Sequence, residues 1–331
     1  MKLATLRNGR PDGRLVIVSR DHSRAIDASD IAANLQLALE QWDTAKPMLQ
    51  ERYERLQADQ LAGTFAFDAK QAMAPLPRSY QWCDGSAFLH HGRLMEKAFK
   101  HPPRENFETI PLLYQGGSDD LLGPCDDVPM SDEGHGIDFE GEFAVFTSRV
   151  PMGCSARDAL GHVALIGQAN DWSLRNLIPR EILTGFGFFQ SKPSTSFAPL
   201  VVTPDELGTS WQDGRVLLDL QIEWNGQWFG NPNGAPMHFG FGELIAHAAR
   251  TRQLCAGTII GSGTVSNDIA GVGSACISER RILEIIESGA PKTGFMVFGD
   301  RVFMEARTAT GDAPFGAIDQ RVVWHAQPKT A

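Results

Sequence analysis

The stretch Ile137-Asp138-Phe139-Glu140-Gly141-Glu142-Phe143-Ala144-Val145 decides how the rest of this sequence is interpreted. Successive side chains of an extended strand point to opposite faces, so the large apolar residues would lie on one face and the three carboxylates on the other. Like charges on one face of a strand repel each other. The stretch therefore predicts a strand with one face in the core and a cation or a group of bases opposite the other. An edge strand with a solvated acidic face is the alternative interpretation.

Length and composition limit the class of protein. The 331 residues are enough for one large or two ordinary domains, and we expect two. A hydrophobic fraction of 42% with 33 glycines and 19 prolines is typical of a globular protein with many turns. The net charge of −10 argues against a nucleic-acid partner, because phosphate binding requires clustered lysines and arginines.

Two kinds of pattern, long apolar runs and paired cysteines, bear on the location and redox state of the protein. The first residues carry no apolar run of signal-peptide length, and no later window approaches about 18 uninterrupted apolar residues. We therefore expect a cytoplasmic protein with no membrane partner. The five cysteines are widely spread and form no C-x-x-C pair, which predicts reduced thiols and neither a disulfide framework nor a zinc site.

A domain boundary is predicted in the segment 73–78, where Pro75 and Pro77 interrupt both helices and strand ladders. Residues 1–75 combine short strands with a helical region, in which Ser29 can cap one helix and Pro47 can occupy the first turn of another. Residues 76–331 are mainly strands and loops with short helices, so the pattern favours a small first domain and a large β-rich second domain.

Three further segments carry polar groups that could belong to a site. Residues 82–91 contain Asp84 and a pair of histidines, although such a pair is more often a surface feature. Residues 170–175, Asn-Asp-Trp-Ser-Leu-Arg, offer a carboxylate and a guanidinium, but an ordinary turn with an ion pair would look the same. The glycine-rich run 257–267 is neither a dinucleotide fingerprint nor a P-loop, and a tight turn between strands is its simpler interpretation.

Taken in order, these groups resemble the fumarylacetoacetate hydrolase family. The resemblance spans roughly residues 80 to 320 and is only loose before them. It implies an α+β fold, in which a β-rich mixed-sheet roll carries the site and follows a smaller N-terminal α/β domain. It rests on Asp84 with His91, Tyr114, the Glu140-Gly141-Glu142 strand, Asn170-Asp171-Trp172-Ser173-Leu174-Arg175, Ser191-Lys192 and Gly261-Ser262-Gly263-Thr264.

The resemblance also implies a metal site and a base. One divalent cation would be held by four carboxylates, and an all-oxygen site suits Mg²⁺, Mn²⁺ or Ca²⁺. Asp138 would stay outside this set, as a supporting or structural residue. His91 falls at the position of the general base, with Glu279 as the carboxylate that orients it and His90 as a neighbour without a catalytic role. The four expected ligands are Asp84, Glu140, Glu142 and Asp171.

The implied reaction is hydrolysis of a carbon–carbon bond in a 2,4-dioxo acid during the breakdown of aromatic compounds, by a homodimer. Lys192 and Arg175 would stabilise the enolate product, and Tyr114 and Thr264 would bind substrate oxygens. Ile178 and Ile182 stand where fumarylacetoacetases carry a polar amide and a tyrosine, which favours an acylpyruvate or related acid over fumarylacetoacetate. The alternatives are a hydratase, decarboxylase or tautomerase of 2-oxo-enoic diacids, and a non-enzymatic protein with a structural cation.

Overall fold

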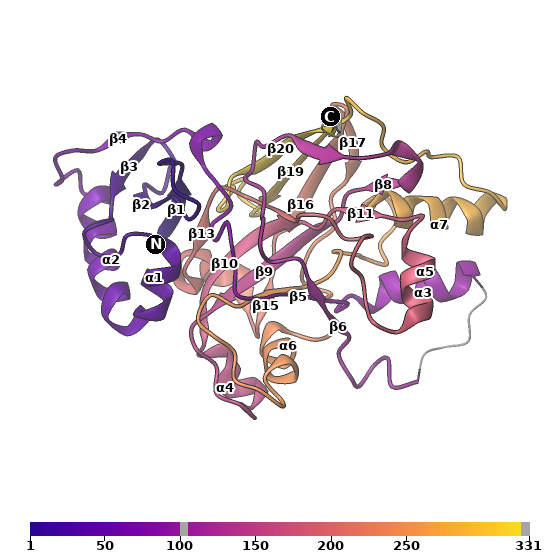
Figure 1. Cartoon of the computed structure of the whole chain (residues 1–331), viewed down its shortest axis with the longest axis horizontal. Coiled ribbons are helices and arrows are strands. Elements are labelled where there is room, and N and C mark those ends of the chain that lie inside the picture. The colour runs from indigo at the N-terminus through magenta and orange to yellow at the C-terminus, as the bar shows by residue number, and fades with distance from the viewer. Residues whose placement is uncertain (100–104, 326–331) are drawn as a thin grey trace, which may run out of the picture.

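The computed structural model describes residues 1–99 and 105–325 (Figure 1). Within those ranges no helix combines the length and the apolar character needed to span a membrane. The first residues form a small α/β unit, drawn in indigo, whose helices pack their apolar side chains against β1 and β2. Its elements are β1 (Lys2–Leu6), β2 (Arg14–Val18), β3 (Arg24–Asp27), α1 (Leu35–Glu40), α2 (Trp42–Gln57), β4 (Phe65–Ala66) and the 3₁₀ turn η1 (Ala69–Gln71).

Neither helix of this unit begins where the sequence pattern predicts: α1 begins later and α2 begins earlier. Asn34, and not Ser29, caps α1 and accepts a hydrogen bond from the backbone N–H of Leu37. Pro47 lies inside α2 instead of in its first turn, because α2 already begins at Trp42, with only Gln41 between it and the end of α1. The missing N–H of Pro47 costs α2 one hydrogen bond in its second turn.

The largest sheet has eleven strands and runs through both parts of the chain. Its order is β4-β3-β2-β1-β13-β10-β9-β18-β5-β6, with β12 paired to β10. Most neighbours are antiparallel, but β18 runs parallel to β5 and antiparallel to β9. The strands outside the first unit are β5 (Trp82–Gly85), β6 (Leu113–Gly116), β9 (Gly141–Thr147), β10 (Val163–Asn170), β12 (Ser196–Phe197), β13 (Val201–Val202) and β18 (Ile259–Gly261).

A second sheet of five strands packs over the β9 half of the first, and Phe143 and Val145 of β9 share one core with Leu220 and Met304. Its order is β17-β16-β19-β20-β7. This mixed-sheet roll with a smaller N-terminal unit confirms the α+β fold predicted from the sequence. The strands are β7 (Val128–Met130), β16 (Asp219–Trp224), β17 (Gln227–Gly230), β19 (Arg301–Arg307) and β20 (Ala317–Trp324), and two small pairs are β8 (Ile137–Asp138) with β11 (Ser173–Leu174) and β14 (Trp211–Gln212) with β15 (Arg215–Val216).

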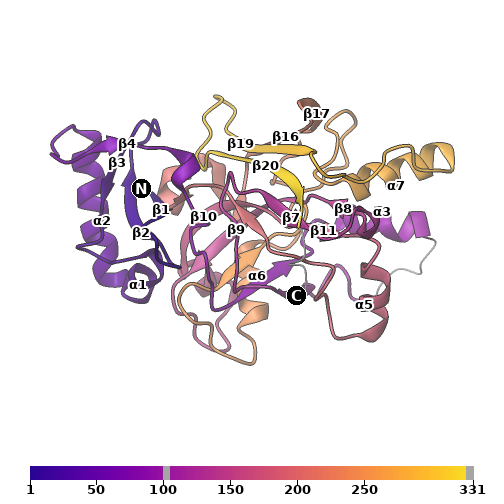
Figure 2. The ribbon, with the colours of Figure 1, turned by 45° about the horizontal axis from the view of Figure 1, so that its top comes forward.

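Short helices flank the roll. Three of them, α3, α5 and α7, gather at the end of the molecule that is far from the N-terminal unit (Figures 1 and 2). Helix α3 packs against α7, so segments nearly two hundred positions apart meet there. The helical elements are α3 (Leu89–Phe99), η2 (Glu133–His135), α4 (Ala156–Leu160), α5 (Ile178–Thr184), η3 (Pro204–Ser210), α6 (Phe241–Ala248) and α7 (Ile277–Ser288).

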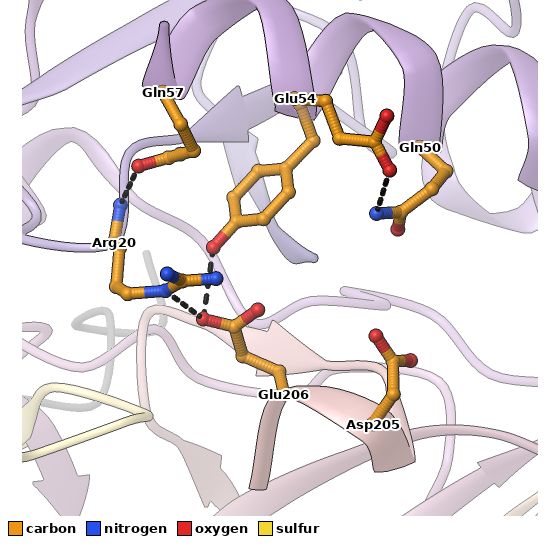
Figure 3. A pocket seen from close by; sticks show the side chains of 7 residues that line it. Arg20, Gln50, Glu54, Gln57, Asp205 and Glu206 are labelled. Carbon is orange, nitrogen blue, oxygen red and sulfur yellow. Dashed lines mark hydrogen bonds and ion pairs between the residues drawn. The ribbon is translucent and has the colours of Figure 1, made fainter. Parts of the chain in front are cut away.

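Glu206 on η3 joins the N-terminal unit to the roll (Figure 3). Its Oε1 accepts hydrogen bonds from the hydroxyl of Tyr53 on α2 at 2.8 Å and from Nε of Arg20 at 3.0 Å. Burial would raise the pKa of Glu206, but Arg20, the N-terminal ammonium and the Tyr53 hydroxyl together lower it. The three side chains line a cavity of about 380 Å³ together with Gln50, Glu54, Gln57 and Asp205. Glu206 therefore remains ionised and fastens α2 to η3.

Candidate active site

Residues 137–145 form two short strands, because the chain leaves the ladder at Phe139 and Glu140 between β8 and β9. All nine residues are buried, the carboxylates included. Phe139 packs edge-on against Phe229, with ring centroids 5.0 Å apart, on the core side. The interpretation as an edge strand with a solvated acidic face is therefore wrong, and each buried carboxylate needs a partner.

Three carboxylates meet at one end of the roll: Asp84 on β5, Glu142 on β9 and Asp171 just after β10. One oxygen of each lies within 4.8 Å of the others. The sheet brings the three residues together. Strand β18 lies between β5 and β9 and pairs with both, and Glu142 on β9 pairs with Ala169 near the end of β10. Both oxygens of Glu142 are buried without a hydrogen-bond partner in the described part of the chain.

The electrostatics of this triad favour a cation. Burial and the Asp171 carboxylate raise the pKa of Asp84 to about 8. Burial, with Asp84 and Asp171 nearby, raises the pKa of Glu142 well above its usual value. A divalent cation would relieve this repulsion and would satisfy the two unpartnered oxygens of Glu142. Mg²⁺, Mn²⁺ and Ca²⁺ fit, because all the available ligand atoms are carboxylate oxygens.

Glu140, the fourth expected ligand, lies outside the triad and contacts two cations instead. Its Oε1 accepts a hydrogen bond from Nη2 of Arg175 at 2.6 Å, and its Oε2 accepts one from Nζ of Lys192 at 2.6 Å. Lys192 also donates to Oδ2 of Asp171 at 2.6 Å. Burial would raise the pKa of Glu140, but Arg175 and Lys192 lower it. Lys192 therefore connects Glu140 to the triad.

Asp171 receives further hydrogen bonds from both sides. Its Oδ1 accepts one from the hydroxyl of Thr195 at 2.6 Å, and its Oδ2 accepts one from the hydroxyl of Tyr114. Burial and Asp171 hold the pKa of Tyr114 well above its usual value, so the phenol remains protonated. Thr195 was not among the predicted residues. Thr195 directly precedes β12, and the pairing of β12 with β10 brings it close to Asp171. The sequence gives no indication of this pairing.

Phe188 is a second residue that the sequence analysis missed. Its ring meets the ring of Tyr114 edge-on, with centroids 5.1 Å apart. Tyr114 also has a charged neighbour, because Nζ of Lys192 lies over its ring, 5.4 Å from the ring centre. On the preceding helix α5, Ile178 is half-buried, whereas Ile182 is 59% exposed. Phe188 thus gives the site an apolar neighbour.

The predicted base and its carboxylate lie together. Nδ1 of His91 on α3 is 2.9 Å from Oε2 of Glu279 on α7. The Glu279 side chain is buried, and the His91 side chain is 17% exposed. The nearest acid to His90 is Asp268, at 3.9 Å. Of the two adjacent histidines, His91 is therefore the one that a buried carboxylate orients.

The turn after β18 completes the surroundings of Asp84. The backbone N–H of Gly263 donates to Oδ1 of Asp84 at 3.1 Å. Gly261 pairs with Asp84, and a Cβ atom at position 261 would lie 2.3 Å from Oδ1 of that residue. Gly263 has a φ of +76°, which favours glycine. Thr264, predicted to bind substrate, is buried directly after this turn.

Comparison with known proteins gives two family matches that together span most of the chain. Residues 81–323 match the family model described as fumarylacetoacetate (FAA) hydrolase C-terminal. Residues 1–78 match the one described as fumarylacetoacetase N-terminal domain 2. The mitochondrial oxaloacetate tautomerase FAHD2B of Homo sapiens is 27% identical over 157 residues, which are 46% of this chain and 48% of that protein. The matched region thus spans about half the length of this curated relative.

Two solved structures share the fold. Maleylpyruvate hydrolase from Sphingobium sp. SYK-6 superposes with a TM-score of 0.66 at 16% identity, over 98% of this chain and 100% of that one. One structure of that enzyme is a complex with manganese (II) ion and pyruvate. Fumarylacetoacetate hydrolase from Exiguobacterium antarcticum superposes with a TM-score of 0.63 at 16% identity, over 98% and 100% of the two chains.

Proposed function

The chain belongs to the fumarylacetoacetate hydrolase family, and from that premise we propose that it is a divalent-metal-dependent hydrolase of the carbon–carbon bond in a 2,4-dioxo acid. Fumarylacetoacetate-like compounds and acylpyruvates form this substrate class. The reaction would belong to the breakdown of aromatic compounds, which releases such acids after ring opening.

The main support is an excess of buried negative charge. Five buried carboxylates, Asp84, Asp138, Glu140, Glu142 and Asp171, surround two cations, Arg175 and Lys192, among the described residues. Isolated buried charge is costly, so such a site requires protons or a cation. Asp84, Glu142 and Asp171 would hold the ion, and Glu140, whose oxygens accept from Arg175 and Lys192, stays a proposed fourth ligand. When bound there, Mg²⁺, Mn²⁺ or Ca²⁺ would polarise substrate carbonyl oxygens as a Lewis acid.

His91 would act as the general base that converts a water molecule to the attacking hydroxide. Because Nδ1 faces Glu279, Nε2 is the ring nitrogen left to accept a proton from water. The hydroxide adds to the acyl carbonyl carbon, and cleavage of the carbon–carbon bond releases one carboxylic acid and the enolate of a 2-oxo acid. Lys192 and Arg175 would stabilise the negative charge of that enolate, which a proton then converts to the ketoacid. Tyr114 and Thr264 would bind substrate oxygens.

The acyl end of the substrate is proposed to be apolar. Phe188 lies against Tyr114, and Ile178 and Ile182 stand where the resemblance to fumarylacetoacetases would place polar side chains that hydrogen-bond an extended diacid. An apolar wall discriminates weakly between hydrocarbons but leaves a charged end unsatisfied. An acylpyruvate with an alkyl or aryl acyl group therefore suits this site better than fumarylacetoacetate.

A tautomerase of 2-oxo diacids is the second candidate, because the matched curated relative is named an oxaloacetate tautomerase. Enolisation needs the same cation and the same charge stabilisation but no attacking water. The two reactions therefore differ in their dependence on a group that activates water.

The test is an assay of purified protein with acetylpyruvate, a longer acylpyruvate and oxaloacetate, each with Mg²⁺, with Mn²⁺ and with a chelator. Metal-dependent release of pyruvate from an acylpyruvate supports the hydrolase. Metal-independent cleavage, or cleavage retained by a Glu142→Ala variant, contradicts it. Metal-dependent enolisation of oxaloacetate without cleavage of any acylpyruvate supports the tautomerase. The same proposal includes a homodimer. Light scattering coupled to size-exclusion chromatography would test it by measuring the molar mass of the protein.

A further inference from the structure

Asp138 is a buried carboxylate for which neither the triad nor the proposed reaction has a use. Its Oδ1 accepts a hydrogen bond from the backbone N–H of Ile277 at 2.7 Å. Its Oδ2 accepts bonds from the backbone N–H of Ser278 at 2.9 Å and from Nε of Arg175 at 2.7 Å. Asp138 therefore joins the first turn of α7 to a side chain of the site.

The first turn of α7 carries the partner of the proposed base. Glu279 directly follows Ser278, and its carboxylate lies 2.9 Å from Nδ1 of His91. The backbone N–H of Glu279 is bonded to Sγ of Cys276 at 3.3 Å, which caps the helix. Any displacement of this turn moves the Glu279 carboxylate relative to His91.

The same acidic segment also holds the chain just before α7. Gly141 donates its backbone N–H to the carbonyl oxygen of Ala275 at 2.9 Å, and Glu140 forms an isolated antiparallel bridge with Cys276. The backbone of residues 140–141 thus fixes where α7 begins, and Asp138 fixes the direction of its first two N–H groups. Negative charge at a helix N-terminus is also favourable.

We propose that Asp138 is a positioning residue that sets the Glu279–His91 pair at a fixed place relative to Arg175. Its two oxygens bind both the first turn of α7 and the Arg175 guanidinium. The positions of His91, through Glu279, and of Arg175 are therefore fixed by the same carboxylate. Asparagine cannot replace it, because an amide offers one acceptor oxygen to three N–H donors and turns its own N–H₂ toward one of them. The consequence for turnover rests on the proposed function, but the geometric consequence for His91 does not.

The test uses Asp138→Asn with two readouts. In protein labelled with ¹⁵N-histidine, the Nδ1-bound proton of His91, identified by its loss in His91→Asn, should shift or disappear. For turnover of an acylpyruvate, kcat should fall by up to about 100-fold, as expected when a reacting group is displaced by about 1 Å. The affinity for Mn²⁺, measured by calorimetry, should change less than 3-fold, because Asp138 is not in the triad.

A double-mutant cycle separates positioning from a merely structural effect. If Asp138 acts through Glu279, the loss of kcat in Asp138→Asn with Glu279→Gln should be smaller than the sum of the two separate losses expressed as free energies. The matched control is Glu206→Gln, which also removes a buried charge that accepts from an arginine, but at the contact with the N-terminal unit. It should lower the melting temperature and leave kcat and the His91 signal unchanged.

Asp138→Glu keeps the charge, lengthens the side chain by one methylene and should also shift the His91 signal, so it serves if the asparagine variant does not fold. An unchanged His91 signal in a folded variant, or fully additive losses in the cycle, overturns the proposal. If wild-type protein turns over no dioxo acid, the proposed function fails, while the His91 signal still decides the role of Asp138.

Discussion

Nδ1 of His91 lies 2.9 Å from Oε2 of Glu279, although 188 positions separate the two residues. The contact exists because α3 and α7 pack together at the end of the roll. A buried carboxylate on one ring nitrogen fixes the tautomer and leaves the other nitrogen to act as a base. This relationship gives the most direct test of the hydrolytic mechanism.

His91→Ala and Glu279→Gln should each lower kcat for an acylpyruvate, by about 10²- to 10⁴-fold for the histidine. Calorimetry should show that both retain the affinity for Mn²⁺, since neither residue lies in the triad. His90→Ala is the matched control, with near wild-type turnover expected. Full turnover by His91→Ala, together with complete loss on metal removal, would favour enolisation over hydrolysis.

Glu142→Gln should change stability in opposite directions with and without metal. In chelator, the variant should melt higher by a few degrees, because the amide needs no proton beside Asp84 and Asp171 and its N–H₂ can donate to them, whereas an unsatisfied buried polar group costs about 1–3 kcal/mol. In Mn²⁺, it should melt lower than wild type, and its affinity should fall by more than the roughly 10- to 100-fold typical of losing an outer partner. Calorimetry and thermal melts measure both. Equal shifts in chelator and in Mn²⁺ would exclude Glu142 as a ligand.

The metal-free protein should lose stability as the pH rises from about 4 to about 8. The pKa of Asp84 is about 8 in the folded chain against an ordinary value of 3.8, so the folded state binds this proton more tightly than the unfolded state. The stabilisation is complete below the lower value and is lost as the pH passes toward the higher one. Comparing melts of wild type and Asp84→Asn isolates this contribution. A wild-type curve parallel to that of the variant would contradict the raised pKa.

Lys192→Met should destabilise the protein even in chelator. The change leaves Glu140 and Asp171 without a shared donor, and breaking one side of a buried ion pair costs about 3–5 kcal/mol. Urea denaturation measures the loss. Lys46→Met, at an exposed position of α2, controls for the substitution itself and should change stability by less than about 0.5 kcal/mol.

Phe188→Ala should weaken the preference for large apolar acyl groups. Loss of the ring beside Tyr114 should lower kcat/KM for a long-chain or aryl acylpyruvate about 10-fold relative to acetylpyruvate, in line with the contribution of a few methylenes. Phe186→Ala, in the same loop but 98% exposed, is the control and should leave the ratio unchanged. An equal loss for all acyl groups would assign Phe188 to support of Tyr114 instead.

Local sequence patterns predict most of the residues of this site. They predict few of the contacts that depend on which strands pair. Alternation along residues 137–145 separates core from carboxylates, yet it could not reveal that the ladder breaks at Glu140 and directs this residue toward Arg175 and Lys192. Thr195 reaches Asp171 only because β12 pairs with β10. The cap of α1 was misplaced because Ser29 and Asn34 are equally good capping residues in isolation.

The position of β18 between β5 and β9 also governs how the chain must be made. Residues 82–85 and 141–147 leave the ribosome well before residues 259–261, the strand that both of them flank. At about 5–20 residues per second, β9 waits on the order of ten seconds for its neighbour. During translation its β18-facing edge lacks its native partner and is open to pairing with another nascent chain. Chaperone dependence in the cell should therefore be set by the synthesis of this three-residue strand more than by the stability of the finished protein.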